Sequence, residues 1–131
     1  MSHDFQPALQ ARLAQLYRAI GSPEHLREIL RDFYARLAAD IMLGFFFTGK
    51  DLGLIADHQA AFILRAMSVT PSYSGKPPAQ AHAAMPPILP GHFDRRLVIL
   101  RETLTARGLA AEDIRTWLDF EEAFRSAVVA G

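Results

Sequence analysis

Histidine, tyrosine and glutamine are the side chains whose types and spacing in this chain could support chemistry. His58 and Gln59 are adjacent in a stretch with helical spacing, His82 follows 24 residues after His58, and Tyr34 lies upstream. Phenylalanines occupy positions 45–47 between these groups. Imidazole is the commonest side-chain ligand of metals, while hydroxyl and amide groups can hydrogen bond to a small polar ligand. Together they suggest a group held between helices.

Each of these residues also has an ordinary structural explanation. His82 could be a half-exposed loop residue, His58 could lie in the core or point sideways to solvent, and Tyr34 could pack in the core with its hydroxyl at the rim. The three phenylalanines could plug a loop over the core. Their joint occurrence favours a bound group. An iron porphyrin would use an imidazole for the metal, aromatic rings for the macrocycle, and hydroxyl and amide groups for a ligand.

Composition indicates one folded domain with a substantial core. Half of the 131 residues are hydrophobic and 10% are aromatic, which argues against disorder. The 14 basic and 14 acidic residues cancel, so neither nucleic acid nor an anionic membrane surface is an expected partner. The absence of cysteine excludes disulfides, zinc–thiolate sites and iron–sulfur clusters.

The chain also lacks the usual signals for export or membrane insertion. Its start, Met-Ser-His-Asp, has neither a basic patch nor an apolar run, and no stretch approaches 18 unbroken apolar residues. We therefore expect a cytoplasmic protein that does not span a membrane.

Apolar residues at helical spacing predict an all-α fold. Helices are expected over about 9–20, 23–37, 51–67, 92–107 and 112–129, with Gly21 and Gly108 as stops and Ser22 and Asp51 as caps. The inner face of the third helix is predicted to carry a mixed stripe: Ile55, His58, Gln59, Phe62, Ile63 and Met67.

A proline-rich segment from 70 to 91 leaves room for one short helix, about 78–85, with His82 in its middle. A helix of two turns is marginal by itself, so something outside it must fix it. A metal bond from the imidazole of His82 would do so.

Several segments in the same order resemble one family. They are Leu16-Tyr17 with Ile20-Gly21, Asp32-Phe33-Tyr34-Ala35-Arg36, Phe46-Phe47, His58-Gln59-Ala60-Ala61-Phe62, Tyr73-Ser74-Gly75-Lys76-Pro77, Ala81-His82 and His92-Phe93-Asp94. In these the chain resembles the truncated haemoglobins, the short two-on-two globins, from about Leu16 to Ala127. The resemblance implies one truncated-globin domain over residues 1–131, a two-on-two helical sandwich around a haem, with 1–7 as a loose N-terminal extension.

The resemblance also implies roles for individual residues. By position, His82 matches the proximal histidine that binds haem iron, and Phe47 matches the phenylalanine packed on the porphyrin face. Tyr34 matches the distal tyrosine whose hydroxyl reaches the ligand on the iron, and Gln59 matches the glutamine that assists it. The other expected haem contacts are Ile55, His58, Phe62, Tyr73, Lys76, Met85, Phe93 and Leu97, of which Tyr73 and Lys76 belong to a loop near the propionates.

Three positions depart from the family pattern or narrow it. Gly21-Ser22 replaces the usual pair of glycines between the first two helices. Ile55, rather than a polar donor, faces the ligand one turn before Gln59. Arg96 stands where one subgroup carries tryptophan, which argues against that subgroup. Tyr34 and Gln59 together look most like the first subgroup.

The resemblance implies a haem b protein that binds dioxygen, nitric oxide or carbon monoxide. Its physiological activity would be oxygen transport or nitric-oxide dioxygenation. Dioxygenation would convert dioxygen and nitric oxide to nitrate and would need an external reductase to restore ferrous iron. His58 could point to the haem edge or act as a second axial ligand, and the latter would suit a ligand sensor or an electron-transfer globin. A haem-free helical regulatory domain is the alternative from another class.

Overall fold

The computed structural model describes residues 7–69 and 87–129 of the chain, and these ranges are helical apart from turns and one isolated bridge between Ile88 and Val129. The elements are α1 (Pro7–Ile20), α2 (Pro23–Ala39), the 3-10 helix η1 (Gly44–Phe47), α3 (Leu52–Ala66), α5 (Pro90–Ala106), α6 (Ala111–Glu122) and α7 (Arg125–Val128). The all-α prediction is confirmed. No helix in these ranges has the length and apolar character needed to cross a membrane. The short helix predicted at 78–85 lies outside the described residues.

The ends of the helices follow from local chemistry. Gly21, at a φ of +96°, ends α1 in the left-handed conformation that glycine adopts without strain. The Ser22 side chain then accepts a hydrogen bond of 3.1 Å from the backbone N–H of His25, with Pro23 in the first turn of α2. Asp51 caps α3 by accepting from Leu54 N–H at 3.0 Å. The predicted stop and caps are confirmed.

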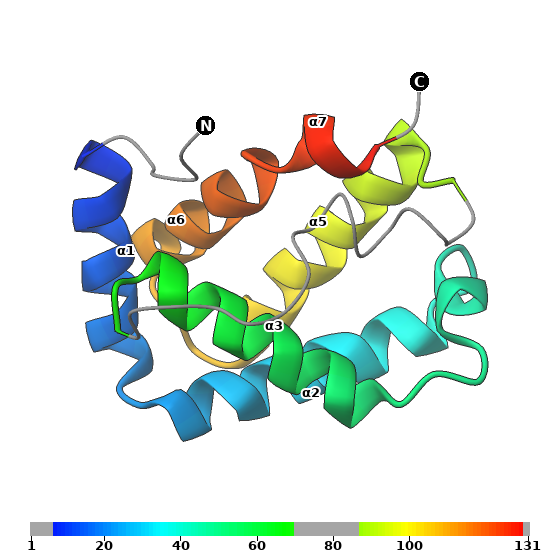
Figure 1. The fold of residues 1–131 in the computed structure, drawn as a ribbon, viewed down its shortest axis with the longest axis horizontal. Coiled ribbons are helices and arrows are strands. Elements are labelled where there is room, and N and C mark those ends of the chain that lie inside the picture. The colour runs from blue at the N-terminus through cyan, green and yellow to red at the C-terminus, as the bar shows by residue number, and fades with distance from the viewer. Residues whose placement is uncertain (1–6, 70–86, 130–131) are drawn as a thin grey trace.

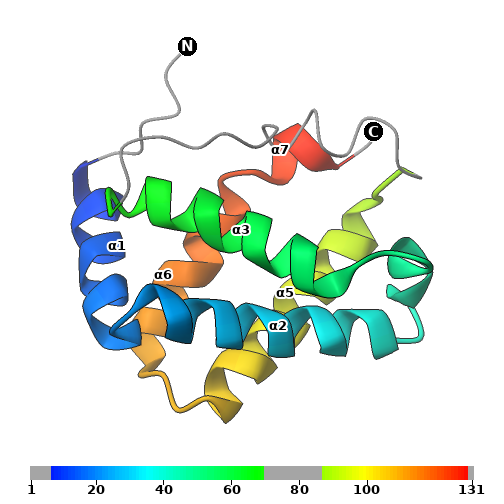
Figure 2. The same cartoon turned by 60° about the horizontal axis from the view of Figure 1, so that its bottom comes forward.

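Four helices form two layers. Figure 2 shows α2 and α3 side by side in front of α5 and α6, and both figures show α1 at one end of the molecule, where it packs on α6. The apolar faces between these layers form one core, which supplies most of the stabilisation through burial of apolar surface. Its largest fully buried side chains include Trp117, Phe33, Phe120, Leu26, Ile29 and Leu100. This two-over-two arrangement is the one that the resemblance implied.

The inner face of the third helix differs from the predicted one. The buried residues of α3 include Ala56 and Ala60, at 0% and 1% exposure, whereas His58 is exposed. Ile63 and Met67 of the predicted face are buried as expected. Ile55, Gln59 and Phe62 are half-buried, because each lies one position before a buried residue and is turned from it by about 100° around the helix. His58 lies two positions before Ala60, about 200° around the helix, and therefore points outward.

The last predicted helix, 112–129, is also wrong as a single element. The helix α6 ends at Glu122, and Phe124, with φ −102° and ψ 0°, precedes the short helix α7. This turn brings the Phe124 ring to 5.3 Å from the rings of Phe62 and Phe120.

Candidate functional site

Tyr34 lies near the C-terminal end of α2 and is only 5% exposed, although it carries a hydroxyl. Its ring centroid is 5.3 Å from that of Phe33 and 5.9 Å from that of Phe47, the latter in an edge-on arrangement. Such edge-on contacts between rings are favourable because of their charge distribution. A buried phenol also needs a polar partner, which makes its surroundings the natural centre of a site.

Phe47 reaches Tyr34 because the segment before it is fixed tightly. Backbone N–H groups of Met42 and Leu43 each donate to Asp40 Oδ2 at 3.1 Å, and Arg95 of α5 donates to Asp40 Oδ1 at 2.8 and 3.1 Å. The Arg95 hydrogen bonds lower the pKa of Asp40 by more than desolvation raises it. This ion pair joins the end of α2 to α5 directly before η1.

The helix α3 carries three predicted site residues that are half-buried. Ile55, Gln59 and Phe62 lie on successive turns and are each partly buried, so they form one stripe along the helix. His58 is exposed and is turned by about 100° from Gln59 about the helix axis. The structure therefore brings Gln59 onto the stripe with the two apolar residues and leaves His58 outside it.

The start of α5 contributes Phe93, which is buried, and Leu97, which is half-buried against the core. The Arg125 guanidinium of α7 lies 4.5 Å from the centre of the Phe93 ring. It also forms ion pairs of 2.7 Å with Asp94 and 2.8 Å with Glu122. These contacts fasten α7 to α5 and cover the outer side of Phe93.

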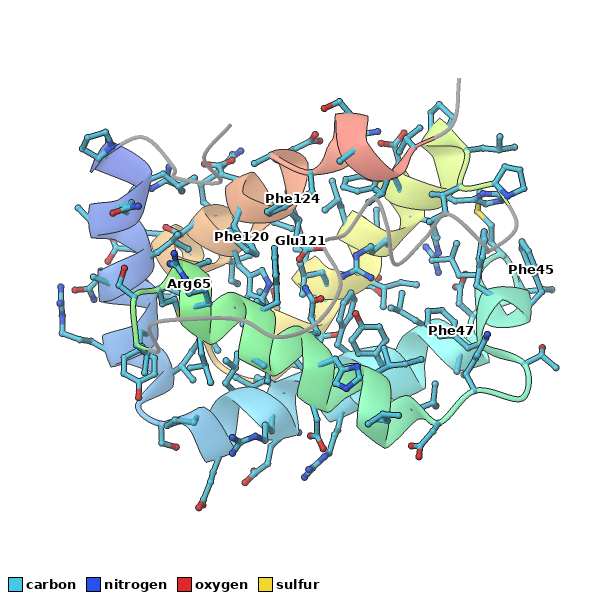
Figure 3. All side chains as sticks on the ribbon, viewed as in Figure 1. Phe45, Phe47, Arg65, Phe120, Glu121 and Phe124 are labelled. Carbon is cyan, nitrogen blue, oxygen red and sulfur yellow. The ribbon has the colours of Figure 1, made fainter. Side chains whose placement is uncertain are left out.

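An ion pair that the sequence did not indicate lies beside Tyr34. Arg96 of α5 donates to Glu121 Oε1 of α6 at 2.8 Å, and the two side chains are 22% and 7% exposed. The guanidinium carbon is 5.0 Å from the Phe33 ring centre and 5.7 Å from that of Tyr34. Burial lowers the pKa of Arg96, but Glu121 and Tyr34 more than offset this and raise it. In Figure 3, Glu121 lies in the middle of the molecule, whereas Phe45 lies at its outer edge.

One feature of the sequence could have indicated that Arg96 needs a partner, although it was not used as a prediction. Arg96 lies between Phe93 and Leu97 on an otherwise apolar part of α5, and an arginine in such a place needs an acid. Its partner, 25 residues later in the sequence, follows no spacing rule. The remaining predicted site residues, Tyr73, Lys76, His82 and Met85, lie outside the described residues, and their roles stay predictions.

Comparison with known proteins assigns the family. The model of the "Bacterial-like globin" family matches residues 15–130. The chain therefore belongs to the bacterial-like globin family.

Its relatives identify the group within this family. The chain is 32% identical over 105 residues to the group 1 truncated hemoglobin GlbN of Mycolicibacterium paratuberculosis, covering 80% of this chain and 76% of that protein. It is 28% identical over 117 residues to the GlbN of Nostoc sp. (strain MUN 8820), covering 89% and 98%. Among these globins it is a truncated, two-on-two globin of group 1.

Solved structures confirm the fold. The ferric truncated hemoglobin of Tetrahymena pyriformis matches with a TM-score of 0.79 at 22% identity, over 88% of this chain and 98% of that one. The cyanomet 2/2 hemoglobin of a Synechococcus species, which has covalently attached heme, matches with a TM-score of 0.77 at 23% identity, over 87% and 97%. Globins are haem proteins that bind diatomic gases, so membership implies a haem cofactor and gas binding.

Gly44 gives a direct test of how this site is positioned. A Cβ at Gly44 would lie 2.7 Å from the carbonyl oxygen of Ala38, so Gly44→Ala must push η1 away from α2. We expect a loss of about 1–3 kcal/mol of unfolding free energy and a changed near-ultraviolet circular dichroism signal from the Tyr34–Phe47 contact. Urea unfolding of the apoprotein measures the first.

Gly53→Ala is the matched control. Its added Cβ would meet only Asp51 Oδ1 at 3.5 Å, an ordinary contact, so stability should stay the same or rise slightly. Equal losses in the two variants would contradict the tight seating of η1.

Proposed function

We propose that this globin binds haem b beside Tyr34 and holds dioxygen, nitric oxide or carbon monoxide on the side of the haem where Tyr34 lies. The observation that carries the proposal is a tyrosine buried between aromatic rings of α2 and η1 and the guanidinium of Arg96 from α5. Bound haem supplies an iron that takes up diatomic gases and can change its oxidation state. The chain has no cysteine for thioether links, which favours haem b held without such bonds.

The residues of the structure suit a flat, largely apolar group. Phe47, Ile55, Phe62 and Leu97 are partly buried against the core and come from η1, α3 and α5. These side chains still expose part of their apolar surface to water. A bound macrocycle would cover that surface, and its removal from water would favour binding. In this proposal Phe93 and Met85 complete the apolar contacts, Tyr73 and Lys76 meet the propionates, and His82 supplies the iron ligand, as the resemblance implies.

Tyr34 and Gln59 are proposed to act as hydrogen-bond donors to the gas. A hydroxyl and an amide can both donate, and donors fixed in a pocket of low dielectric act more strongly than in water. Ile55 offers no donor and would keep water from the same space. Dioxygen, which takes on negative charge in haem pockets, gains more from such donors than carbon monoxide does.

Nitric-oxide dioxygenation is the more specific activity that this donor pair supports. With haem bound, this activity would convert dioxygen and nitric oxide to nitrate at the cost of one electron from the haem iron, and a separate reductase would have to return that electron. Within this activity Tyr34 and Gln59 retain dioxygen long enough to meet nitric oxide.

Substitution of the donors tests the proposal. Tyr34→Phe and Gln59→Leu should each raise the dioxygen dissociation rate by about tenfold or more, because a charge-assisted hydrogen bond contributes about 1.5–3 kcal/mol. Carbon monoxide dissociation should hardly change. Stopped-flow measurements on the reduced protein give both rates, and Tyr17→Phe on α1 is the control. Equal effects on the two gases would show that neither side chain donates to the ligand.

His58 is proposed to lie toward the haem edge, where it could meet a propionate, because it is exposed while Gln59 is on the half-buried stripe. The ferrous, gas-free protein should then show a broad visible band typical of five coordination, unchanged in His58→Ala. Absorption spectra of the two proteins make the comparison. Sharply split bands in the parent that disappear in the variant would instead assign His58 as the second axial ligand.

A further inference from the structure

Arg96 places a positive charge against the buried ring of Tyr34. Its guanidinium carbon lies 5.7 Å from the Tyr34 ring centre, and its Nε donates to Glu121 at 2.8 Å. Two helices from the same layer, α5 and α6, thus meet through an ion pair that also contacts α2 of the opposite layer. The guanidinium lies over the rings of Phe33 and Tyr34, and Glu121 is in the middle of the molecule (Figure 3).

Holding this pair costs desolvation energy. Exchange of a buried ion pair for well-packed apolar side chains of similar volume is often neutral or stabilising, so stability alone gives little reason for it. Arg125 shows the contrasting case: it stacks on Phe93 in the same manner, but its acids, Asp94 and Glu122, are 65% and 47% exposed. Glu121 is only 7% exposed, which sets the Arg96 pair apart.

The donors and acceptors of Arg96, Glu121 and Tyr34 limit where the hydroxyl hydrogen of Tyr34 can point. Arginine carries five N–H donors and no acceptor, and a carboxylate only accepts. The Nε–H of Arg96 donates to Glu121, and the same guanidinium lies 5.7 Å from the ring centre of Tyr34. Toward Tyr34 the guanidinium can only donate, so it cannot accept the hydroxyl hydrogen. The hydroxyl hydrogen of Tyr34 is then directed elsewhere, to another acceptor.

We propose that Arg96, braced by Glu121, is a positioning residue that directs the hydroxyl hydrogen of Tyr34 toward the gas and makes it a stronger donor. A phenol held beside a cation is polarised, because the positive charge draws electron density toward itself and makes the O–H group a stronger donor. The pocket is thereby biased toward ligands with partial or full negative charge, including dioxygen and small anions such as azide. This inference rests on the proposed function, because Tyr34 meets such ligands only when haem is bound.

The carbonyl form gives a spectroscopic test that does not depend on activity. A positively polarised donor beside carbon monoxide lowers its C–O stretching frequency, so Arg96→Met should move the infrared band to higher wavenumber. Tyr34→Phe should do the same. Because Arg96 acts through Tyr34, the double variant should shift no further than Tyr34→Phe alone. Azide affinity of the ferric protein, followed at the Soret band, should fall about tenfold in Arg96→Met.

Arg125→Met is the matched control, since it removes an arginine that stacks on an aromatic ring and is paired with two acids but does not contact Tyr34. It should leave the C–O band in place. Glu121→Gln keeps an acceptor for Arg96 but removes the charge, and it should shift the band in the same direction by a smaller amount. This variant carries the test if Arg96→Met does not fold.

Two results would overturn the inference while the proposed function stands. One is a haem-loaded parent whose C–O band is the same in Arg96→Met and Glu121→Gln. The other is additive shifts in the double variant, which would mean that Arg96 acts on the ligand without Tyr34. Failure of the parent chain to take up haemin would contradict the proposed function and this inference together. In the apoprotein, slow hydrogen exchange of the Arg96 Nε–H in nitrogen-15 NMR checks the ion pair without haem.

Discussion

The arrangement at the centre of this molecule depends on one constraint: the buried hydroxyl of Tyr34 needs polar partners. Tyr34 is enclosed by aromatic rings, and a polar group in such surroundings is costly unless it is hydrogen bonded. The Arg96–Glu121 pair supplies a cation on one side of it. Helices from both layers, α2 on one side and α5 and α6 on the other, thus contribute side chains to this site. The site therefore depends on how these helices are placed relative to one another more than on any single loop.

Ion pairs at the periphery fix the elements that carry the apolar walls. Asp40 and Arg95 hold the end of α2 to α5, so that η1 presents Phe47 to Tyr34. Arg125 ties α7 to the start of α5. Partly exposed pairs add little stability individually, at about 0–1 kcal/mol. Their contribution here is geometric, since each joins segments that are far apart in sequence and that flank the site.

Sequence patterns predicted the features that depend on residues close in the chain, such as helix ends and caps. They missed the features that depend on contacts between residues far apart in the chain. The end of α1 at Gly21 and the caps at Ser22 and Asp51 follow from local hydrogen bonding and were predicted correctly. The break at Phe124 accompanies a contact of its ring with Phe62 on another helix, and periodicity within 112–129 shows neither the break nor the contact. The Arg96–Glu121 pair likewise joins α5 and α6. The burial of Ala56 and Ala60 instead of His58 depends on which face α3 turns to the core, and that is decided by the packing of the whole helix.

Haemin titration of the apoprotein, in the parent and in His82→Ala, tests the central claim most directly. The account predicts stoichiometric uptake by the parent, with a strong Soret band and a five-coordinate ferrous spectrum, because an imidazole on one side and the Tyr34 pocket on the other hold the group. His82→Ala should lose most of the affinity while the helical content of α1 to α7 is retained in circular dichroism. Full occupancy and an unchanged ferrous spectrum in His82→Ala, or no uptake by the parent, would contradict it.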